Sequence, residues 1–117
     1  MGDRANVNVK GSDDDTGVFL YTHWGGTELP NTLKRALAKK WRWEDDQYLA
    51  RIIFDEMIGN NKGGETGFGI SSYCGDGKSR ILVVNIGKQS VSFGDKSWSF
   101  TEYIELPENF VVWECGQ

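Results

Sequence analysis

The chain has 117 residues, of which 38% are hydrophobic and 13% aromatic, and this composition predicts one globular domain over residues 1–117. Seventeen acidic residues against 13 basic ones give a net charge of −4 and an isoelectric point near 4.9, which argues against a nucleic-acid binder held by phosphate contacts. No stretch approaches the roughly 18 consecutive apolar residues of a membrane span, and "MGDRANVNVKGSDDD" has no apolar signal core, so we expect a cytoplasmic protein that does not enter the membrane.

Two strand-like segments open the chain. They are "ANVNVK" at 5–10 and "GVFLYTH" at 17–23. The intervening "GSDDDTG" is rich in the turn-forming residues Gly, Ser and Asp, so these segments together predict a β-hairpin with an acidic loop.

The pattern changes to a helical one after Glu28. The apolar residues at helical spacing are Leu29, Leu33, Ala36, Leu37 and Trp41. Thr27 is the predicted N-cap of this helix, and Pro30 is tolerated in its first turn.

A second helix is predicted over residues 46–58. Asp45 or Asp46 caps its start, and Gly59 ends it. Apolar residues cover most of its circumference and leave a narrow polar stripe, so we expect this helix to be the most buried element of the chain.

The C-terminal half begins with three strand-like segments. They are "FGISSYC" at 68–74, "SRILVVNIG" at 79–87 and "QSVSF" at 89–93. Their short gaps predict antiparallel neighbours, because a parallel crossover takes about a dozen residues or more. Ser99 and Glu102 match a capping box and predict a short helix over 100–105, while 109–115 is either a final strand or an apolar tail on the sheet.

The resulting order, ββααβββ with a short C-terminal helix, predicts an α+β domain in which an antiparallel sheet of about five strands has two helices on one face. The strand residues predicted to face the helices are Phe19, Tyr21, Phe68, Ile70, Leu82, Val84 and Val91. The opposite face is a partner surface or a homodimer interface if it carries uncovered aromatic residues.

The two cysteines, Cys74 and Cys115, lie far apart, and neither has a second Cys or His at ligand spacing. A zinc site needs about three or four protein ligands, so we expect no metal and no cofactor. Two reduced, buried thiols are the favoured interpretation, and a disulfide between them stays open.

The junction "THWGGTELP" carries the strongest signal for a small-ligand site. Gly25 and Gly26 precede a helix N-terminus, whose amides favour an anion, while His23 offers a donor or base and Trp24 a stacking surface. This combination fits a nucleotide or small-ligand site, or the pocket of a hydrolase. The alternative is structural: His23 secures the strand end and Trp24 covers the core, and we favour it.

Charged residues are segregated along the chain, which predicts a surface that steers protein partners. "KRALAKKWRW" at 34–43 holds five of the 13 basic residues and no acidic one. The candidate partner-binding residues are Lys34, Arg35, Lys39, Arg42 and Trp43 on this segment, with Asp13, Asp14 and Asp15 in the acidic loop. The alternative for the basic segment is a solvated helix face, with its side chains pointing to solvent.

The segments "YTHWGGTELP" (21–30), "YLARIIFDEM" (48–57) and "ETGFGIS" (65–71) resemble a family of small uncharacterised proteins encoded in bacterial genomes and phages. The resemblance extends over residues 17–100 and implies a compact soluble domain. The family brings no established activity, so it assigns no role to any residue.

Small acidic single-domain proteins of phages are often inhibitors of host defence, including anti-CRISPR proteins. We therefore expect a non-enzymatic module that binds a host protein through acidic and aromatic surface patches. A small-ligand or nucleotide-binding domain at His23, Trp24, Gly25 and Gly26 is the alternative.

Overall fold

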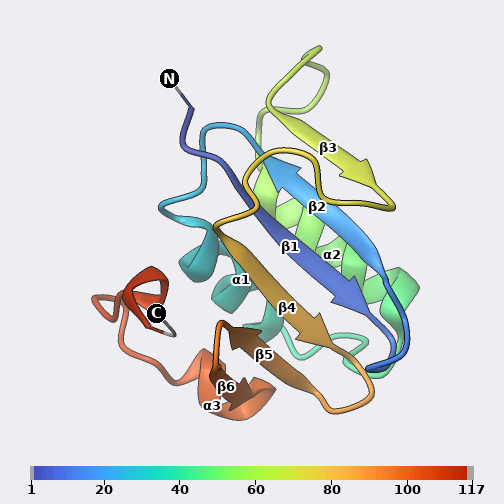
Figure 1. Ribbon diagram of the computed structural model, residues 1–117, viewed down its shortest axis with the longest axis vertical. Coiled ribbons are helices and arrows are strands. Elements are labelled where there is room, and N and C mark those ends of the chain that lie inside the picture. The colour runs from blue at the N-terminus through green and yellow to red at the C-terminus, as the bar shows by residue number, and fades with distance from the viewer. Residues whose placement is uncertain (1, 116–117) are drawn as a thin grey trace.

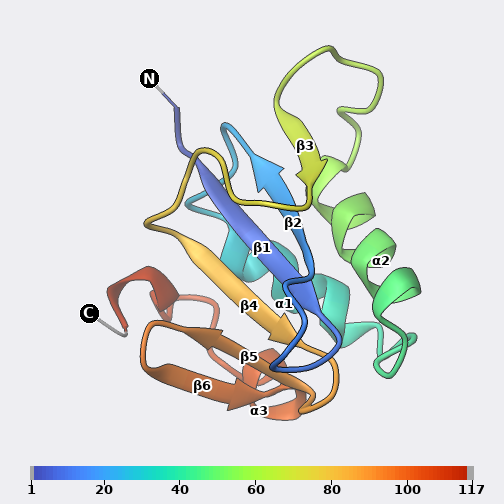
Figure 2. The ribbon, with the colours of Figure 1, turned by 45° about the vertical axis from the view of Figure 1, so that its right-hand side comes forward.

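The computed structural model describes residues 2–115 and has the predicted α+β class. In chain order the elements are β1 (Ala5–Lys10), β2 (Val18–Thr22), α1 (Leu29–Ala38), α2 (Asp46–Ile58), β3 (Phe68–Ser71), β4 (Ile81–Asn85), β5 (Ser90–Phe93), β6 (Lys96–Ser99), α3 (Phe100–Ile104) and the 3₁₀ turn η1 (Val112–Glu114). Helices α1 and α2 lie on one face of the sheet (Figures 1 and 2). No helix among the described residues is long and apolar enough to cross a membrane.

The sheet is mixed and six-stranded, in the order β3-β2-β1-β4-β5-β6, so the prediction of a five-stranded antiparallel sheet is wrong in detail. β1 and β4 are parallel, and the other neighbouring pairs are antiparallel. β3 and β4 are not neighbours, because residues 72–80 carry the chain past β2 and β1 on the face away from the helices (Figure 1). The side-chain amide of Asn6 donates to the carbonyl oxygen of Asp76 at 2.8 Å and so fastens this crossing segment to the sheet.

The core lies between the sheet and α1, α2 and α3. Its strand residues share one face, since Val7 is opposite Leu20 on one side and Leu82 on the other. They pack with buried residues of the helices such as Leu33, Leu49 and Ile53, all of which are fully buried. Helix 46–58 therefore contributes to the centre of the core, but five of its residues are only half-buried and five are exposed, so it is not the most buried element.

The predicted side-chain orientation of β2 is wrong. Phe19 lies opposite Asn8 rather than a core residue, so Phe19 and Tyr21 are on the face away from the helices. The other predicted positions lie on the helix-covered side, and the ring of Phe68 contacts that of Phe54 on α2 at 6.4 Å. Ile70 shares this side but is 58% exposed.

Local capping explains where two of the helices begin. The side chain of Asp45 accepts hydrogen bonds from the amides of Gln47 and Tyr48, and Ser99 and Glu102 form the predicted capping box. The predicted N-cap of α1 is wrong, because Glu28 holds that position without a side-chain bond.

The C-terminal third contains two departures from the sequence prediction. Strand β6 was missed, since its four residues run directly into α3 at Ser99. Segment 109–115 forms no strand but carries η1, where the buried Trp113 packs its ring against Phe93 at 5.0 Å. Cys74 and Cys115 are free thiols that are half-buried rather than buried, and burial raises the pKa of Cys74.

Candidate functional site

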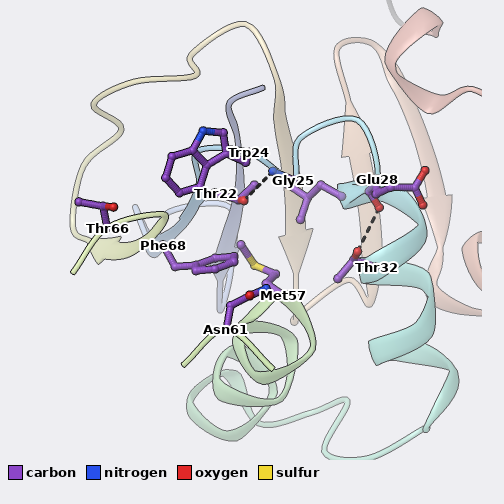
Figure 3. Close-up of a pocket in the computed structure, with 10 residues that line it drawn as sticks. Thr22, Trp24, Gly25, Glu28, Thr32, Met57, Asn61, Thr66 and Phe68 are labelled. Carbon is purple, nitrogen blue, oxygen red and sulfur yellow. Dashed lines mark hydrogen bonds between the residues drawn. The ribbon is translucent and has the colours of Figure 1, made fainter. Parts of the chain in front are cut away.

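Trp24 projects from the end of β2 with 60% of its surface exposed, so the expectation that it covers the core is wrong. Next to it is a hollow of about 500 Å³ between the end of β2 and helices α1 and α2 (Figure 3). Its lining residues are Thr22, Trp24, Gly25, Glu28, Leu29, Thr32, Met57, Asn61, Thr66 and Phe68. The apolar residues of this lining include Leu29, Met57 and Phe68, and Figure 3 shows Met57 and Phe68 on the side of the indole that faces α2.

Two further hollows lie on the opposite face of the sheet, and they share Tyr21 and Asp76 with each other. One, of about 450 Å³, shares Trp24, Thr66 and Phe68 with the first and adds Tyr21, His23, Gly67 and Asp76. The other, of about 210 Å³, lies over Gly69 and is lined by Asn6, Tyr21, Ile70, Ser71, Tyr73, Gly75 and Asp76. Trp24 therefore separates a hollow on the helix side from one on the open side. We call Trp24, Ile70, Tyr73 and the three hollows the Trp24 surface.

The position of the exposed indole is fixed by its neighbours. The His23 ring meets it edge-on, with ring centroids 4.7 Å apart. Gly67 has a φ of +104°, and a Cβ at this position would lie 2.9 Å from the indole, so the backbone needs glycine there. Trp24 is thus held in an ordered position although more than half of it faces solvent.

His23 is tied to the strand end, as the structural interpretation predicted. Its Nδ1 lies 2.9 Å from the Tyr21 hydroxyl and 3.5 Å from Arg4 Nε. The Tyr21 hydroxyl is therefore the nearer partner of this ring nitrogen, and Arg4 Nε donates to it over the longer distance. The backbone of His23 bonds on both sides, to Gly67 and to Asp3.

The amides of the Gly25–Gly26 turn are engaged inside the protein. Gly25 donates to Thr22 Oγ1 at 3.0 Å, Gly26 to the carbonyl oxygen of Asp3 at 2.7 Å, and Thr27 to Asp3 Oδ2 at 2.8 Å. Gly26 is required for this approach, since a Cβ would lie 2.5 Å from that carbonyl oxygen. The carboxylate of Asp3 thus accepts a hydrogen bond from the Thr27 amide, which an external anion would otherwise accept. Gly26 is buried and lines none of the three hollows.

Asp3 is itself paired with a cation. Its Oδ1 lies 2.5 Å from the Arg80 guanidinium, which in turn stacks on Trp113. Burial raises the pKa of Asp3, but the hydrogen bonds from Thr27 and Arg80 outweigh it and lower the pKa below its ordinary value.

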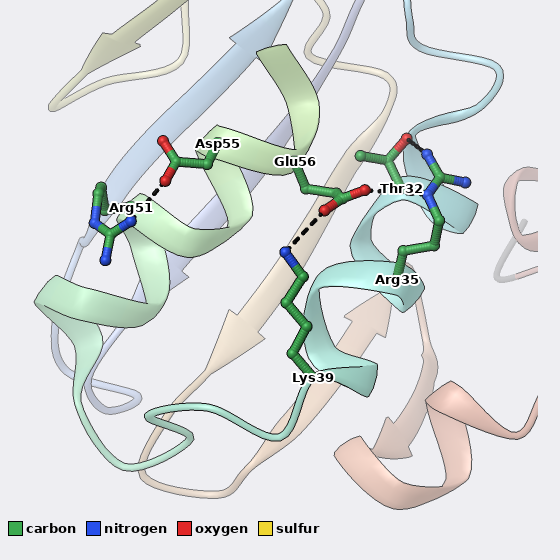
Figure 4. Close-up of polar contacts among 6 residues, drawn as sticks. All are labelled: Thr32, Arg35, Lys39, Arg51, Asp55 and Glu56. Carbon is green, nitrogen blue, oxygen red and sulfur yellow. Dashed lines mark hydrogen bonds and ion pairs between the residues drawn. The ribbon is translucent and has the colours of Figure 1, made fainter. Parts of the chain in front are cut away.

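Most of the candidate basic side chains at 34–43 contact other residues of the protein. Glu56 of α2 accepts from Arg35 of α1 and from Lys39, the C-cap residue just after α1, both at 3.2 Å (Figure 4). Lys34 is half-buried and donates to the Leu106 carbonyl oxygen, so the expectation that these side chains all point to solvent is wrong for it. Arg42 lies outside α1 and stacks on the Tyr48 ring at 4.7 Å.

The two tryptophans of this segment exchange the roles predicted for them. Trp41 follows the end of α1 and is 58% exposed, so it does not belong to the apolar helix face. Trp43 is half-buried, packs its ring on Phe100 at 5.3 Å and donates to the Leu37 carbonyl oxygen. A helix that ends at Ala38 cannot bring residue 41 to its apolar face.

Two of the three aspartates in the acidic loop are engaged by other groups of the protein. Asp13 pairs with Lys88 at 2.8 Å, and Asp15 accepts from the amides of Gly11 and Gly17 at 3.0 Å. Asp14 is exposed. This loop lies at the opposite end of β1 and β2 from Trp24, so the candidate residues form separate surfaces (Figure 1).

Sequence reasoning missed several residues of the Trp24 surface, notably Met57, Ile70, Tyr73 and Asp76. Met57 and Ile70 follow apolar patterns that are typical of core residues, and Tyr73 and Asp76 lie in the crossing segment. Comparison with known proteins adds no assignment: no family model matches the chain, and no curated protein or solved structure does.

Proposed function

We propose that this protein is a non-enzymatic protein-binding module whose contact surface is the Trp24 surface. The observation that carries this proposal is an exposed tryptophan held in place by Gly67 and His23, with hollows on both sides of it. Large aromatic side chains on ordered backbone are the usual energetic centre of protein interfaces, because they bury much area at little entropic cost. Ile70 and Tyr73, which line the hollow over Gly69, are also exposed.

A small-ligand site is the second candidate, because the volume of about 500 Å³ is in the range of such sites. The polar groups at its wall are partly engaged within the chain. Thr22 Oγ1 accepts from Gly25, and Thr32 Oγ1 donates to the Glu28 carbonyl oxygen and accepts from Arg35. The Thr22 hydroxyl can still donate to a ligand, so the protein partner is placed first because of the exposed indole of Trp24 and not because of these polar groups.

The partner that we propose is a bacterial host protein met in the cytoplasm, with inhibition of a host defence system as the biological outcome. The small size of the chain and its net charge of −4 support this part of the proposal. The acidic side chains favour a partner with a basic contact surface.

The experiment compares two tryptophan variants in capture from a bacterial lysate. Trp24 and Trp41 have nearly equal exposure, 60% and 58%, but Trp41 follows α1, away from the three hollows. We expect Trp24→Ala to lose the captured protein and Trp41→Ala to retain it, with both variants melting as the parent does. Equal capture by the two variants would contradict the proposal.

A further inference from the structure

We propose that the partner binds as an extended segment that adds a strand to the open edge of β3, with basic side chains on one face of that segment and apolar ones on the other. This inference rests on the proposed function and names the kind of partner. It combines the chemistry of the sheet edge, the positions of the hollows and the charges that line them.

The two edge strands of the sheet, β6 and β3, differ in how well they are protected from pairing with another chain. At the β6 edge, Lys96 supplies a charge, and α3 folds back so that Tyr103 meets the Trp98 ring at 5.8 Å. β3 has the sequence Phe-Gly-Ile-Ser, without the charge or proline that usually blocks an edge. It forms the other border of the sheet (Figure 1).

The register leaves backbone groups of β3 directed outward. The amide of Asn6 donates to the Arg80 carbonyl oxygen, so Asn6 turns its backbone groups toward β4, and the next residue, Val7, turns its own toward its partner Leu20 in β2. The residue after Leu20, Tyr21, therefore turns its backbone groups toward β3, where its partner is Gly69. Because hydrogen-bonded pairs alternate in an antiparallel ladder, Gly69 and Ser71 turn their backbone groups toward β2. The amides and carbonyls of Phe68 and Ile70 therefore point away from β2, where an added strand would pair.

The surroundings of β3 offer space for alternate side chains of such a strand. On the open face, the hollow over Gly69 is unobstructed, since a Cβ at Gly69 would meet nothing within 4 Å. On the helix side, Ile70 presents an apolar surface that is 58% exposed. Side chains of an extended segment point alternately to these two faces.

The charges that line the hollows indicate which side chains each face of the added strand would carry. Asp76 lines both open-face hollows, whereas Glu28 lines only the hollow between β2, α1 and α2, which does not include Ile70. Among the described residues, no lysine or arginine lines any of the three. Lysine or arginine side chains of the added strand would thus lie near Asp76, and aliphatic ones would cover Ile70.

The test uses a blocked hexapeptide of alternating lysine and valine with the full-length protein. We expect the peptide at saturation to slow amide hydrogen exchange of Phe68 and Ile70 by about tenfold or more, because these amides gain hydrogen bonds. Alternating glutamate and valine should bind more weakly than the lysine peptide. Asp76→Asn should weaken the lysine peptide several-fold and leave the melting temperature unchanged.

Three results would overturn the inference. They are unchanged exchange of both amides with the lysine peptide, equal binding of the glutamate peptide, and undiminished binding of a lysine peptide that is N-methylated at alternate residues in either register. If the amides of Phe68 and Ile70 exchange more slowly at higher protein concentration without any peptide, the strand that pairs with β3 belongs to a second copy of the chain, and the inference is wrong. If the peptide test gives one of these results but Trp24→Ala still loses the captured protein selectively, strand addition is rejected and the proposed function is retained.

Discussion

Asp3 and Thr27 are joined by two hydrogen bonds, from the Thr27 amide to Oδ2 at 2.8 Å and from its hydroxyl to Oδ1 at 3.0 Å. The ion pair with Arg80 extends this contact to the residue just before β4. The N-terminal segment, the turn before α1 and the end of the crossing segment are therefore fastened together by one carboxylate.

The Asp3 contact predicts a specific acid sensitivity. Since the pKa of Asp3 is lowered in the folded chain, its ionised form adds stability above the ordinary value of 3.8, and this is lost as the pH falls through the lower folded value. Asp3→Asn should remove part of the stability loss below about pH 4, measured as the unfolding free energy against pH. Asp14→Asn, at an exposed loop position, is the control. An unchanged acid profile in Asp3→Asn would contradict the role of this carboxylate.

The position of α2 in the core is tested with two isoleucines. Ile53 is fully buried and Ile70 is 58% exposed. Ile53→Ala should lower the unfolding free energy by about 2 to 5 kcal/mol through lost burial and a cavity. Ile70→Ala should change it by about 0.5 kcal/mol or less. Denaturant melting of both variants checks this, and a similar cost for the two would show that α2 is misplaced.

The contact between α1 and α2 predicts a salt-sensitive contribution from Glu56. Burial raises the pKa of Glu56, but the bonds from Lys39 and Arg35 lower it below the ordinary value of 4.5. Glu56→Gln should cost up to about 1 kcal/mol at neutral pH, and the cost should shrink in high salt and as the pH falls through the folded value. Asp55→Asn breaks only a pair within α2 and should cost about 0.3 to 0.5 kcal/mol. No difference from the parent in low salt would show that the bridge adds nothing.

Features set by neighbouring residues were predictable from the sequence. Helix 46–58 with its Asp45 cap and the capping box at Ser99 agree with the prediction, because their hydrogen bonds join residues two or three apart. The parallel pairing of β1 with β4 was not predictable, since it joins distant segments across a crossing of irregular structure. The orientation of β2 failed because Phe19 and Leu20 are both apolar, so the alternation does not say which one faces the core.

The candidate site was predictable only in part. The junction at Trp24 attracted attention through its composition, and the hydrogen bond that holds His23 agrees with the structural interpretation. The engagement of the Gly26 amide by Asp3 depends on how the N-terminal segment passes the turn. The exposure of Trp24 and Trp41 likewise depends on where neighbouring elements end, which residue type alone does not decide.

His23 is expected to act by positioning Trp24 and the strand end. His23→Ala should lower the unfolding free energy by about 1 kcal/mol, the usual net value of one hydrogen bond, and should retain most of the partner capture that Trp24→Ala loses. Thermal melting and capture with the same lysate measure both effects. A variant that melts as the parent does but captures nothing would instead place His23 in contact with the partner.

The most direct test of the Trp24 surface is hydroxyl-radical footprinting of the protein alone and in complex with a captured partner. Trp24 and Trp41 are similarly exposed in the free chain, so each serves as the internal reference for the other. Binding through the Trp24 surface predicts that oxidation of Trp24 falls in the complex while that of Trp41 is unchanged. Protection of Trp41 with Trp24 still oxidised at its original rate would contradict the proposed function.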